Sequence, residues 1–239
     1  MPRFFSDDIT EDTAVISGSD AVHIGRSLRM RIGDDLIVCK NGIEYSTSIQ
    51  SISDEQVICK VNSFCKSIAE PDIELTLFQA IPKGDKLDMI VQKAVELGAV
   101  KICPVITSRC VSRPDNKSFE KKRRRLQKIA LEAAKQSGRG IIPEISEIMN
   151  ISKCTELLAK MDHSFIFYEK GGKKLSEVGL TANSKVGIFI GSEGGFEQSE
   201  VDECAEKGIT VIGLGNRILR CETAPISAIS IIMNLTGNM

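Results

Sequence analysis

Tryptophan is absent from the 239 residues of the chain, and there are only two tyrosines and two histidines. The eight cysteines never form a C-x-x-C pair. Together with the scarcity of histidine, this argues against a structural zinc site and against a disulfide framework. We therefore expect reduced cysteines, each packed as a small hydrophobic residue, and no bound metal ion.

Long apolar runs are missing as well. No stretch approaches the roughly 20 apolar residues that a membrane helix needs, and acidic residues stand early in the chain, where an export signal would be apolar. These absences predict a cytoplasmic protein without a membrane partner. The formal net charge is −1, so any surface that binds a polyanion has to be local.

The first part of the chain is rich in short predicted strands. Asn41-Gly42 stands between two alternating runs and favours the type I′ turn of a β-hairpin. A short helix, predicted to be capped by Ser19, precedes this hairpin. Short strands around one helix predict a small β-barrel domain over residues 1–70.

From about residue 72, strands and helices alternate, which is typical of parallel strands joined by helices. The acidic, proline-containing stretch at 68–72 is the predicted linker, so we expect a second domain of the α/β class over residues 71–239. Predicted strands cover residues 73–81, 101–106, 164–168, 185–190 and 210–214, and predicted helices cover residues 85–98, 118–138, 155–161, 199–208 and 224–235.

Two of these strands end in glycine-rich loops. GSEGGF follows the strand at 185–190, and GNRILRCET follows the strand at 210–214. Ligands of open α/β sheets bind beyond the carboxyl ends of strands, where glycine lets the backbone approach closely, so the two loops predict a shared pocket. The carboxylate of Glu193 suits a ligand with positive charge or hydroxyl donors.

The sequence motifs that bind dinucleotides and nucleoside triphosphates are incomplete or absent. Gly213-Leu214-Gly215 begins a G-x-G motif, but Ile218 occupies the third glycine position, and no G-K-[ST] sequence is present. A nucleotide-dependent oxidoreductase is therefore an alternative that only the α/β pattern supports.

The combination of motifs resembles a known family. GSEGGF, LGNRILRCETA and the apolar final helix, with QKAVELGAVKICPV and LEAAKQSGRG, are similar to the SPOUT class of S-adenosylmethionine-dependent RNA methyltransferases. The likeness is nearest to the bacterial 16S ribosomal RNA (uracil-N3)-methyltransferase family, whose PUA-like β-barrel resembles HIGRSLRMRIGDDLIV. The resemblance implies a C-terminal SPOUT-type parallel sheet with a trefoil knot, small-subunit ribosomal RNA as substrate and S-adenosyl-L-methionine as cofactor.

The resemblance also implies which residues contact that cofactor. The chain departs from the family at Ser192 and Asn216, where proline is common, and at Cys221, where threonine is common. We expect Cys221 to be a packed residue and not a nucleophile. The implied contacts come from both loops: Ile190, Gly191, Glu193, Gly194 and Gly195, and Leu214, Gly215, Ile218 and Leu219.

Methylation of uracil N3 requires that N3 lose its proton, so the site has to stabilise an anionic base or accept that proton. Arg220 and Arg217 are candidates for stabilising the charge, and Arg139 is a second candidate for the substrate pocket. Glu222 is a candidate base, but it is equally suited to orient an arginine or to cap the final helix.

Basic residues gather locally. Lys121, Arg125 and Lys128 share one face of the helix at 118–138, and this face either binds RNA or is merely solvated. Arg26, Arg29 and Arg31 form another candidate RNA-binding patch, and Arg217 is a further candidate. The scarcity of aromatic residues favours recognition of folded RNA through phosphates and shape.

The final helix is too apolar to be left uncovered. The resemblance implies a homodimer with this helix near the interface, and the alternative is a core helix of a monomer. Three functional alternatives to uracil N3 methylation stay open on the residues alone: an RNA-binding protein without catalysis, a SPOUT ribose 2′-O-methyltransferase, and the oxidoreductase.

Overall fold

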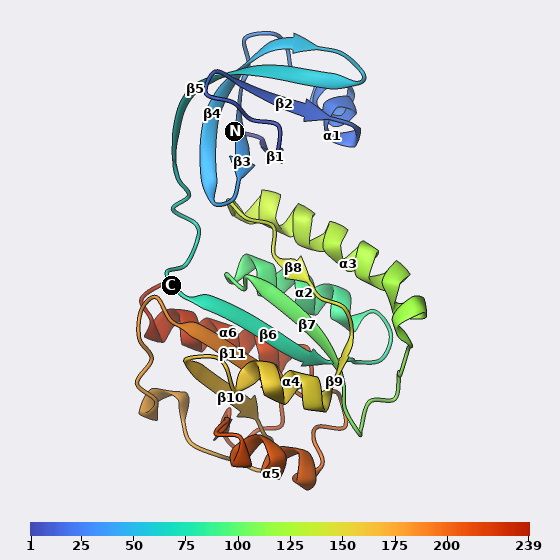
Figure 1. The fold of residues 1–239 in the computed structure, drawn as a ribbon, viewed down its shortest axis with the longest axis vertical. Helices are drawn as coiled ribbons and strands as arrows, with labels where there is room; N and C mark the ends of the chain where they lie inside the picture. Colours follow the sequence, from blue (N-terminus) through green and yellow to red (C-terminus); the bar gives the residue numbers. More distant parts are fainter. The chain divides into compact units, whose positions relative to one another are not determined.

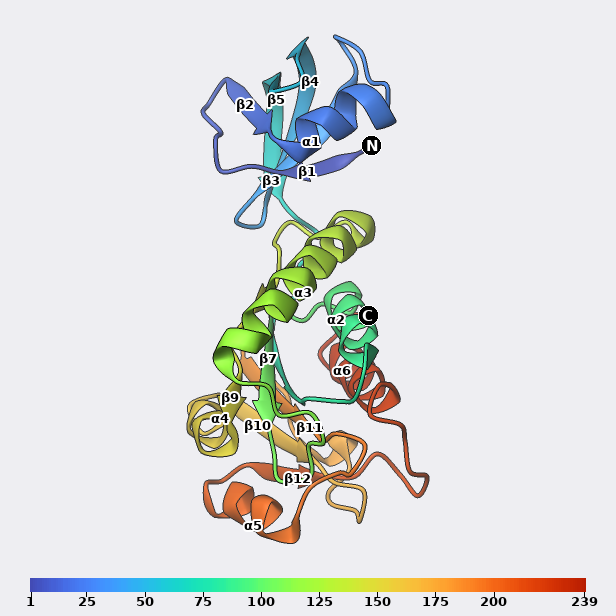
Figure 2. The same cartoon turned by 90° about the vertical axis from the view of Figure 1, so that its right-hand side faces the viewer.

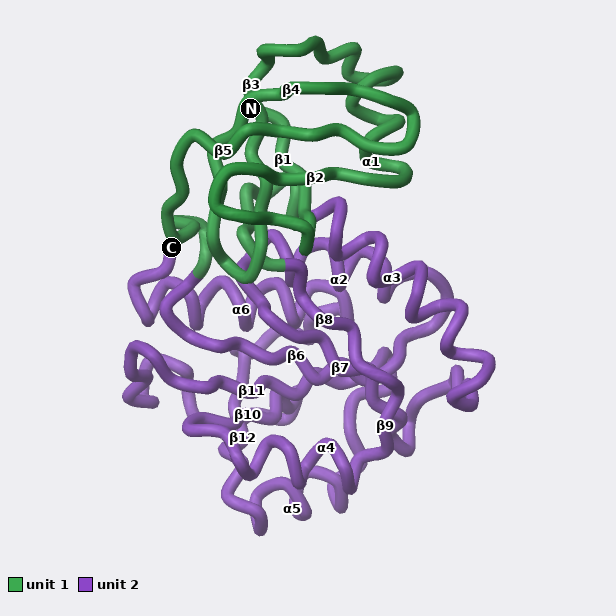
Figure 3. The backbone as a smooth tube through the Cα atoms, turned by 45° about the horizontal axis from the view of Figure 1, so that its top comes forward, with its two compact units in different colours: residues 1–70, 134–141 green, residues 71–133, 142–239 purple.

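The computed structural model describes residues 1–239, and the chain divides into two compact units. The first comprises residues 1–70 and 134–141, and the second comprises residues 71–133 and 142–239 (Figure 3). The sequence predicts a single boundary near residue 70 and so assigns residues 134–141 to the second domain, whereas the structure groups them with the first unit. None of the helices has the length and apolar character that crossing a bilayer requires.

The first unit is a five-stranded half-barrel sheet in the order β1-β3-β4-β5-β2. β1 runs parallel to β3, and the other neighbours are antiparallel. The predicted hairpin turn is confirmed, because Asn41 and Gly42 have φ of 50° and 79°. The strands are β1 (Arg3–Phe5), β2 (Thr13–Ser17), β3 (Asp35–Lys40), β4 (Ile43–Ile52) and β5 (Gln56–Lys66).

The predicted short helix is present, but its cap differs from the prediction. α1 (Ser19–Val22) continues into the π-helical turn η1 (His23–Ser27). Gly18, with φ of 69°, occupies the N-cap position, so no side chain caps this helix and the predicted role of Ser19 is wrong. Ala21 and Ile24 are buried in the core that the sheet forms.

A buried ion pair explains why residues 134–141 belong to the first unit. The guanidinium of Arg139, which is 1% exposed, donates from Nε (3.0 Å) and Nη2 (2.7 Å) to the Glu70 carboxylate. Glu70 Oε1 also accepts from the amides of Gly140 (2.8 Å) and Ile141 (3.1 Å). Arg139 thus makes a buried ion pair within this unit, and its role in the substrate pocket stays a prediction.

The second unit confirms the predicted parallel α/β sheet. Its order is β12-β10-β11-β6-β7-β8, with β9 beside β7, and every pair is parallel. The strands are β6 (Glu74–Ala80), β7 (Lys101–Ile106), β8 (Glu144–Ile145), β9 (Met149–Asn150), β10 (His163–Phe167), β11 (Lys185–Ile190) and β12 (Thr210–Ile212).

Helices cover both faces of this sheet (Figures 1 and 2). α2 and α6 pack against one another, and α4 and α5 bury apolar side chains with the sheet on the other face. α4 begins earlier than predicted, because the Asn150 side chain accepts the Lys153 amide and caps it. The helices are α2 (Lys86–Glu96), α3 (Asn116–Ser137), α4 (Ile151–Leu158), the 3₁₀ turn η2 (Leu175–Glu177), α5 (Gln198–Glu206) and α6 (Thr223–Leu235).

Two segments of the second unit lie in close contact at the carboxyl end of β12. The Lys173 amide donates to the Val211 carbonyl (3.0 Å), and the Gly213 amide donates to the Lys173 carbonyl (3.1 Å). A Cβ on Gly172 would lie 2.6 Å from the Val211 carbonyl oxygen, so only glycine fits there. The contact places the loop after β10 against the segment that leads to α6. The trefoil knot itself stays a prediction.

Replacing Glu70 by glutamine should destabilise the first unit by about 3 kcal/mol, because it removes a carboxylate charge that the buried guanidinium of Arg139 contacts. The measurement is hydrogen exchange at the Gly140 and Ile141 amides, which donate to Glu70. Arg26→Gln is the control, since the Arg26–Asp54 pair is exposed and its loss should leave exchange unchanged. Equal protection of both amides in E70Q and the unsubstituted protein would contradict the structural role of this pair.

Candidate active site

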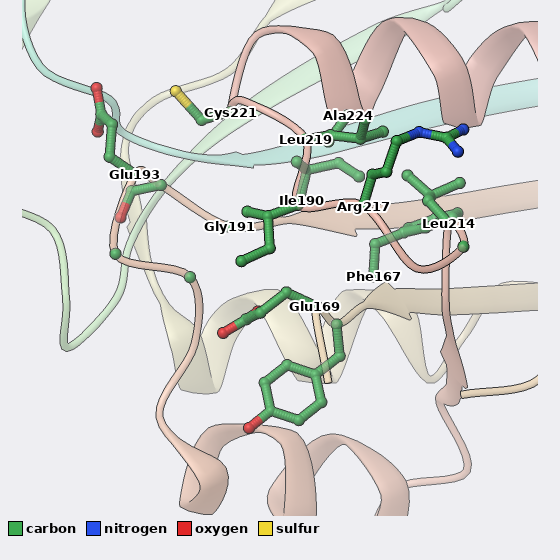
Figure 4. Close-up of a pocket in the computed structure, with 16 residues that line it drawn as sticks. Phe167, Glu169, Ile190, Gly191, Glu193, Leu214, Arg217, Leu219, Cys221 and Ala224 are labelled. Carbon is green, nitrogen blue, oxygen red and sulfur yellow. The ribbon is translucent and has the colours of Figure 1, made fainter. Parts of the chain in front are cut away.

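Three parallel strands deliver their loops to one pocket. β11 and β12 flank β10, and Phe167 pairs in register with both Ile190 and Ile212, so the three strands end side by side. The loops that follow, with the start of α6, line a pocket of about 230 Å³ (Figure 4). All nine residues predicted to contact a cofactor line it: Ile190, Gly191, Glu193, Gly194, Gly195, Leu214, Gly215, Ile218 and Leu219.

One side of the pocket is apolar and the opposite side carries a carboxylate. Phe167, Leu214 and Ala224 lie on one side of it, and Glu193 lies on the opposite side (Figure 4). Ile218 also lines the pocket but is 84% exposed, so its side chain is largely in contact with solvent. The apolar side suits a flat, weakly polar ring.

The glycines of the first loop are required by close approaches. Gly195 has φ of 67°, and a Cβ there would lie 2.7 Å from Glu169 Oε1. A Cβ on Gly194 would lie 3.0 Å from the Arg109 Cβ. The Gly195 amide donates to the Ser192 carbonyl (3.0 Å), so the turn forms although Ser192 stands where the family commonly has proline.

Arg109, in the loop after β7, holds the first glycine loop in place. Its Nε and Nη2 donate to the Glu197 carboxylate (2.9 and 3.1 Å), and its Nη1 donates to the Gly194 carbonyl (2.8 Å). The hydrogen bond with Glu197 raises the pKa of Arg109. No sequence motif indicated this role, because Arg109 lies about 85 residues before the loop that it supports.

Glu193 faces a lysine, Lys86, that no sequence motif marked. Its carboxylate accepts from Lys86 Nζ (2.8 Å) and from the Lys83 amide (3.1 Å). Burial raises the pKa of Glu193, but the hydrogen bonds from Lys86 and from the backbone outweigh it, and the net shift is downward. Glu193 is therefore ionised at neutral pH.

Glu222 stands at the N-cap position of α6 without capping it, because its side chain accepts no hydrogen bond from the helix. Its Oε2 lies 3.2 Å from the Cys221 Sγ and 3.7 Å from Lys86 Nζ. The hydrogen bond from the Cys221 thiol, with the charges of Lys86 and Arg220, lowers the pKa of Glu222. A carboxylate whose pKa is lowered is a weak proton acceptor.

Glu169 is a pocket residue that no motif marked. It follows β10 and lines the pocket, and its carboxylate accepts no hydrogen bond and forms no ion pair within 4.0 Å. Arg217 also lines the pocket, and its guanidinium forms no hydrogen bond or ion pair. Arg220 is exposed and does not line the pocket. The pocket thus offers one free carboxylate and one free guanidinium.

The candidate RNA-binding residues are all exposed, but they differ in their partners. Lys121 and Lys128 on α3 form no ion pair, whereas Arg125 donates to Asp85 (3.1 Å) and Asp88 (2.9 Å). In the first unit, Arg26 pairs with Asp54, and Arg29 and Arg31 are exposed without an ion pair.

Similarity to known proteins identifies the family. Residues 69–233 match the family model of the RNA methyltransferase domain, and residues 16–62 match that of the RNA methyltransferase PUA domain. The chain is 36% identical to ribosomal RNA small subunit methyltransferase E of Bacillus subtilis, over 92% of this chain and 89% of that one. The chain belongs to the ribosomal RNA small subunit methyltransferase E family. The family predicted from the sequence is therefore confirmed.

Solved structures of the methyltransferase E family and of related proteins share the fold. Ribosomal RNA small subunit methyltransferase E of Neisseria gonorrhoeae, bound to S-adenosyl methionine, has a TM-score of 0.88 at 28% identity and covers 99% of this chain and 98% of its own. A putative methyltransferase of Legionella pneumophila, in complex with the bound cofactor SAM, has a TM-score of 0.88 at 29% identity and covers 98% of this chain and 97% of its own.

Cys221 should resist alkylation. It is 5% exposed, and burial raises the pKa of its thiol to about 12, so almost none of it is thiolate at pH 8. We expect iodoacetamide at pH 8 to modify the exposed Cys65 while Cys221 stays intact, with Cys221 labelling rising steeply only as the pH approaches that pKa. Peptide mass spectrometry after timed quenching measures both rates. Labelling of the two cysteines at equal rates would contradict this account.

Proposed function

We propose that this chain transfers the methyl group of S-adenosylmethionine to N3 of a uridine in small-subunit ribosomal RNA, in the cytoplasm. The observation that carries the proposal is the pocket, which brings the nine residues implied by the family together from two loops of the chain. Family membership supports the reaction class, and the related structures named as bound to S-adenosylmethionine support the cofactor.

The residues of the pocket fit this cofactor. Phe167, Leu214 and Ala224 would contact the adenine ring, and the glycine loops would offer it backbone amides and carbonyls. The unpaired carboxylate of Glu169 would face one of its cationic groups. When bound, the cofactor supplies an electrophilic methyl group on a sulfonium.

Positioning should supply most of the acceleration, with the arginines adding electrostatic stabilisation. Arg217 lines the pocket without a partner, so its guanidinium is free to face the uracil oxygens as N3 loses its proton. Arg220, exposed on the same loop, would contact the RNA strand or the base. Glu222 is better suited to orienting cations than to accepting the proton, because its pKa is lowered, and the proton leaves to solvent.

Small-subunit RNA incubated with the protein and methyl-labelled S-adenosylmethionine should yield labelled 3-methyluridine on nucleoside mass spectrometry. A label on ribose would support the 2′-O alternative instead. Gly194→Trp should abolish cofactor binding and product, because even a Cβ would press on Arg109. Gly179→Trp is the control, since nothing lies within 4 Å of its Cβ position. RNA binding without any labelled product would favour the non-catalytic alternative.

The exposed lysines of α3 are proposed to contact RNA phosphates. Lys121→Gln with Lys128→Gln should weaken RNA binding several-fold and lower the slope of log affinity against log salt by about 2, one unit for each lost phosphate contact. Lys185→Gln is the control, because Lys185 lies at the amino end of β11, away from the strand ends that form the pocket. Filter binding over a salt series gives the slope. An unchanged slope in the double variant would mean that this face is only solvated.

The chain is also proposed to form a homodimer. α2 and α6 pack against one another and expose Met89, Ile231 and Leu235, which are 47%, 41% and 43% accessible. Sedimentation should give twice the chain mass of 26.1 kDa, and Ile231→Glu should give the monomer. Val111→Glu, at an exposed apolar position in the loop after β7, should stay dimeric. A monomer in the unsubstituted protein would contradict the proposal.

A further inference from the structure

Lys86, the first residue of α2, lies between two carboxylates that come from different loops of the pocket. Its Nζ is 2.8 Å from Glu193 Oε1 in the loop after β11 and 3.7 Å from Glu222 Oε2 in the loop after β12. It also lies 3.9 Å from the Cys221 Sγ. Lys86 does not line the pocket, although Glu193 and Cys221 do. One ammonium group therefore joins both glycine loops to the same helix.

The contact of Lys86 with two carboxylates differs from an ordinary surface ion pair, because all three side chains are partly buried. The side chains of Lys86, Glu193 and Glu222 are only 33%, 29% and 17% exposed. Both carboxylates are ionised at neutral pH, and Lys86 is the cation that lies within 4.0 Å of each. Without that cation, two negative charges would face one another across the two loops with little solvent to screen them.

The two loops do not depend on Lys86 equally. Glu193 is also held by the Lys83 amide, at 3.1 Å, and this backbone contact would survive any substitution of the Lys86 side chain. The first loop has a second anchor in Arg109, which donates to the Gly194 carbonyl. Glu222 has no comparable second anchor, since its other close partner is the neighbouring Cys221 thiol.

We propose that Lys86 is a positioning residue that holds the loop after β12 at the spacing from the loop after β11 that the cofactor requires. This inference rests on the proposed function for the identity of the cofactor. Lys86 acts through Glu193 and Glu222 and does not touch the ligand. Its removal should weaken cofactor binding while the chemical step, once both substrates are saturating, changes little.

The test compares Lys86→Met, Lys86→Arg and Lys83→Met with the unsubstituted protein. Lys83→Met is the matched control, because Lys83 contacts Glu193 through its backbone amide and its side chain makes no hydrogen bond or ion pair. Calorimetric titration with S-adenosylmethionine should show about a fivefold rise in Kd for K86M, recovery in K86R and no change in K83M. The kcat at saturating cofactor and RNA should stay within about twofold in K86M.

A double variant distinguishes charge repulsion from loss of packing. Glu222→Gln added to K86M removes one of the two facing carboxylates, so it should restore most of the cofactor affinity that K86M loses. Cofactor affinity in K86M equal to that of the unsubstituted protein, or no recovery in the K86M/E222Q double variant, would overturn the proposal.

Hydrogen exchange in the absence of cofactor separates this proposal from the proposed function. Residues 219–223 should exchange faster in K86M than in K83M, and residues 191–196 should change less, because the first loop keeps its other anchors. If the unsubstituted protein failed to bind S-adenosylmethionine, the proposed cofactor would be wrong, while this measurement would still decide whether Lys86 orders the second loop. Unchanged exchange at residues 219–223 would overturn the role of Lys86.

Discussion

The parallel pairing of β10 with β11 and β12 is the constraint on which the rest of the structure depends. Parallel strands deliver their carboxyl ends to the same edge of a sheet, so loops that are about 20 residues apart in the chain meet there. The glycines of GSEGGF then let one loop fold tightly enough to leave a pocket. A change of strand order would separate the loops, and no local sequence feature would compensate for it.

Ion pairs between neighbouring loops neutralise most of the charged side chains around the pocket. Arg109 is paired with Glu197 and with the Gly194 carbonyl, and Lys86 is shared by Glu193 and Glu222. These pairs order the loops and leave Glu169 and Arg217 unpaired. A cationic cofactor and a base that becomes anionic would each meet a complementary charge. The paired charges therefore order the loops, and the unpaired charges remain available to contact ligands.

Periodicity and glycine spacing predicted the parallel sheet, the Asn41-Gly42 turn and a pocket shared by the two loops, because each has a local sequence signature. The individual residues that line the pocket were implied by the family resemblance. Sequence patterns did not reveal Lys86, Arg109 or Glu169, whose positions depend on which strands become neighbours. The buried pair of Arg139 with Glu70 was not predicted either, because it depends on how distant segments of the first unit pack. The cap of α1 was also misplaced, because the positive φ of Gly18 is a tertiary feature that composition does not encode.

Protection from hydrogen exchange on addition of S-adenosylmethionine tests the central claim most directly. If one cofactor is held by all three strand ends, the amides of residues 167–169, 191–195 and 214–219 should slow together, with the same dependence on cofactor concentration, while those of the first unit stay unchanged. Protection of only one glycine loop, or of none, would contradict a shared pocket.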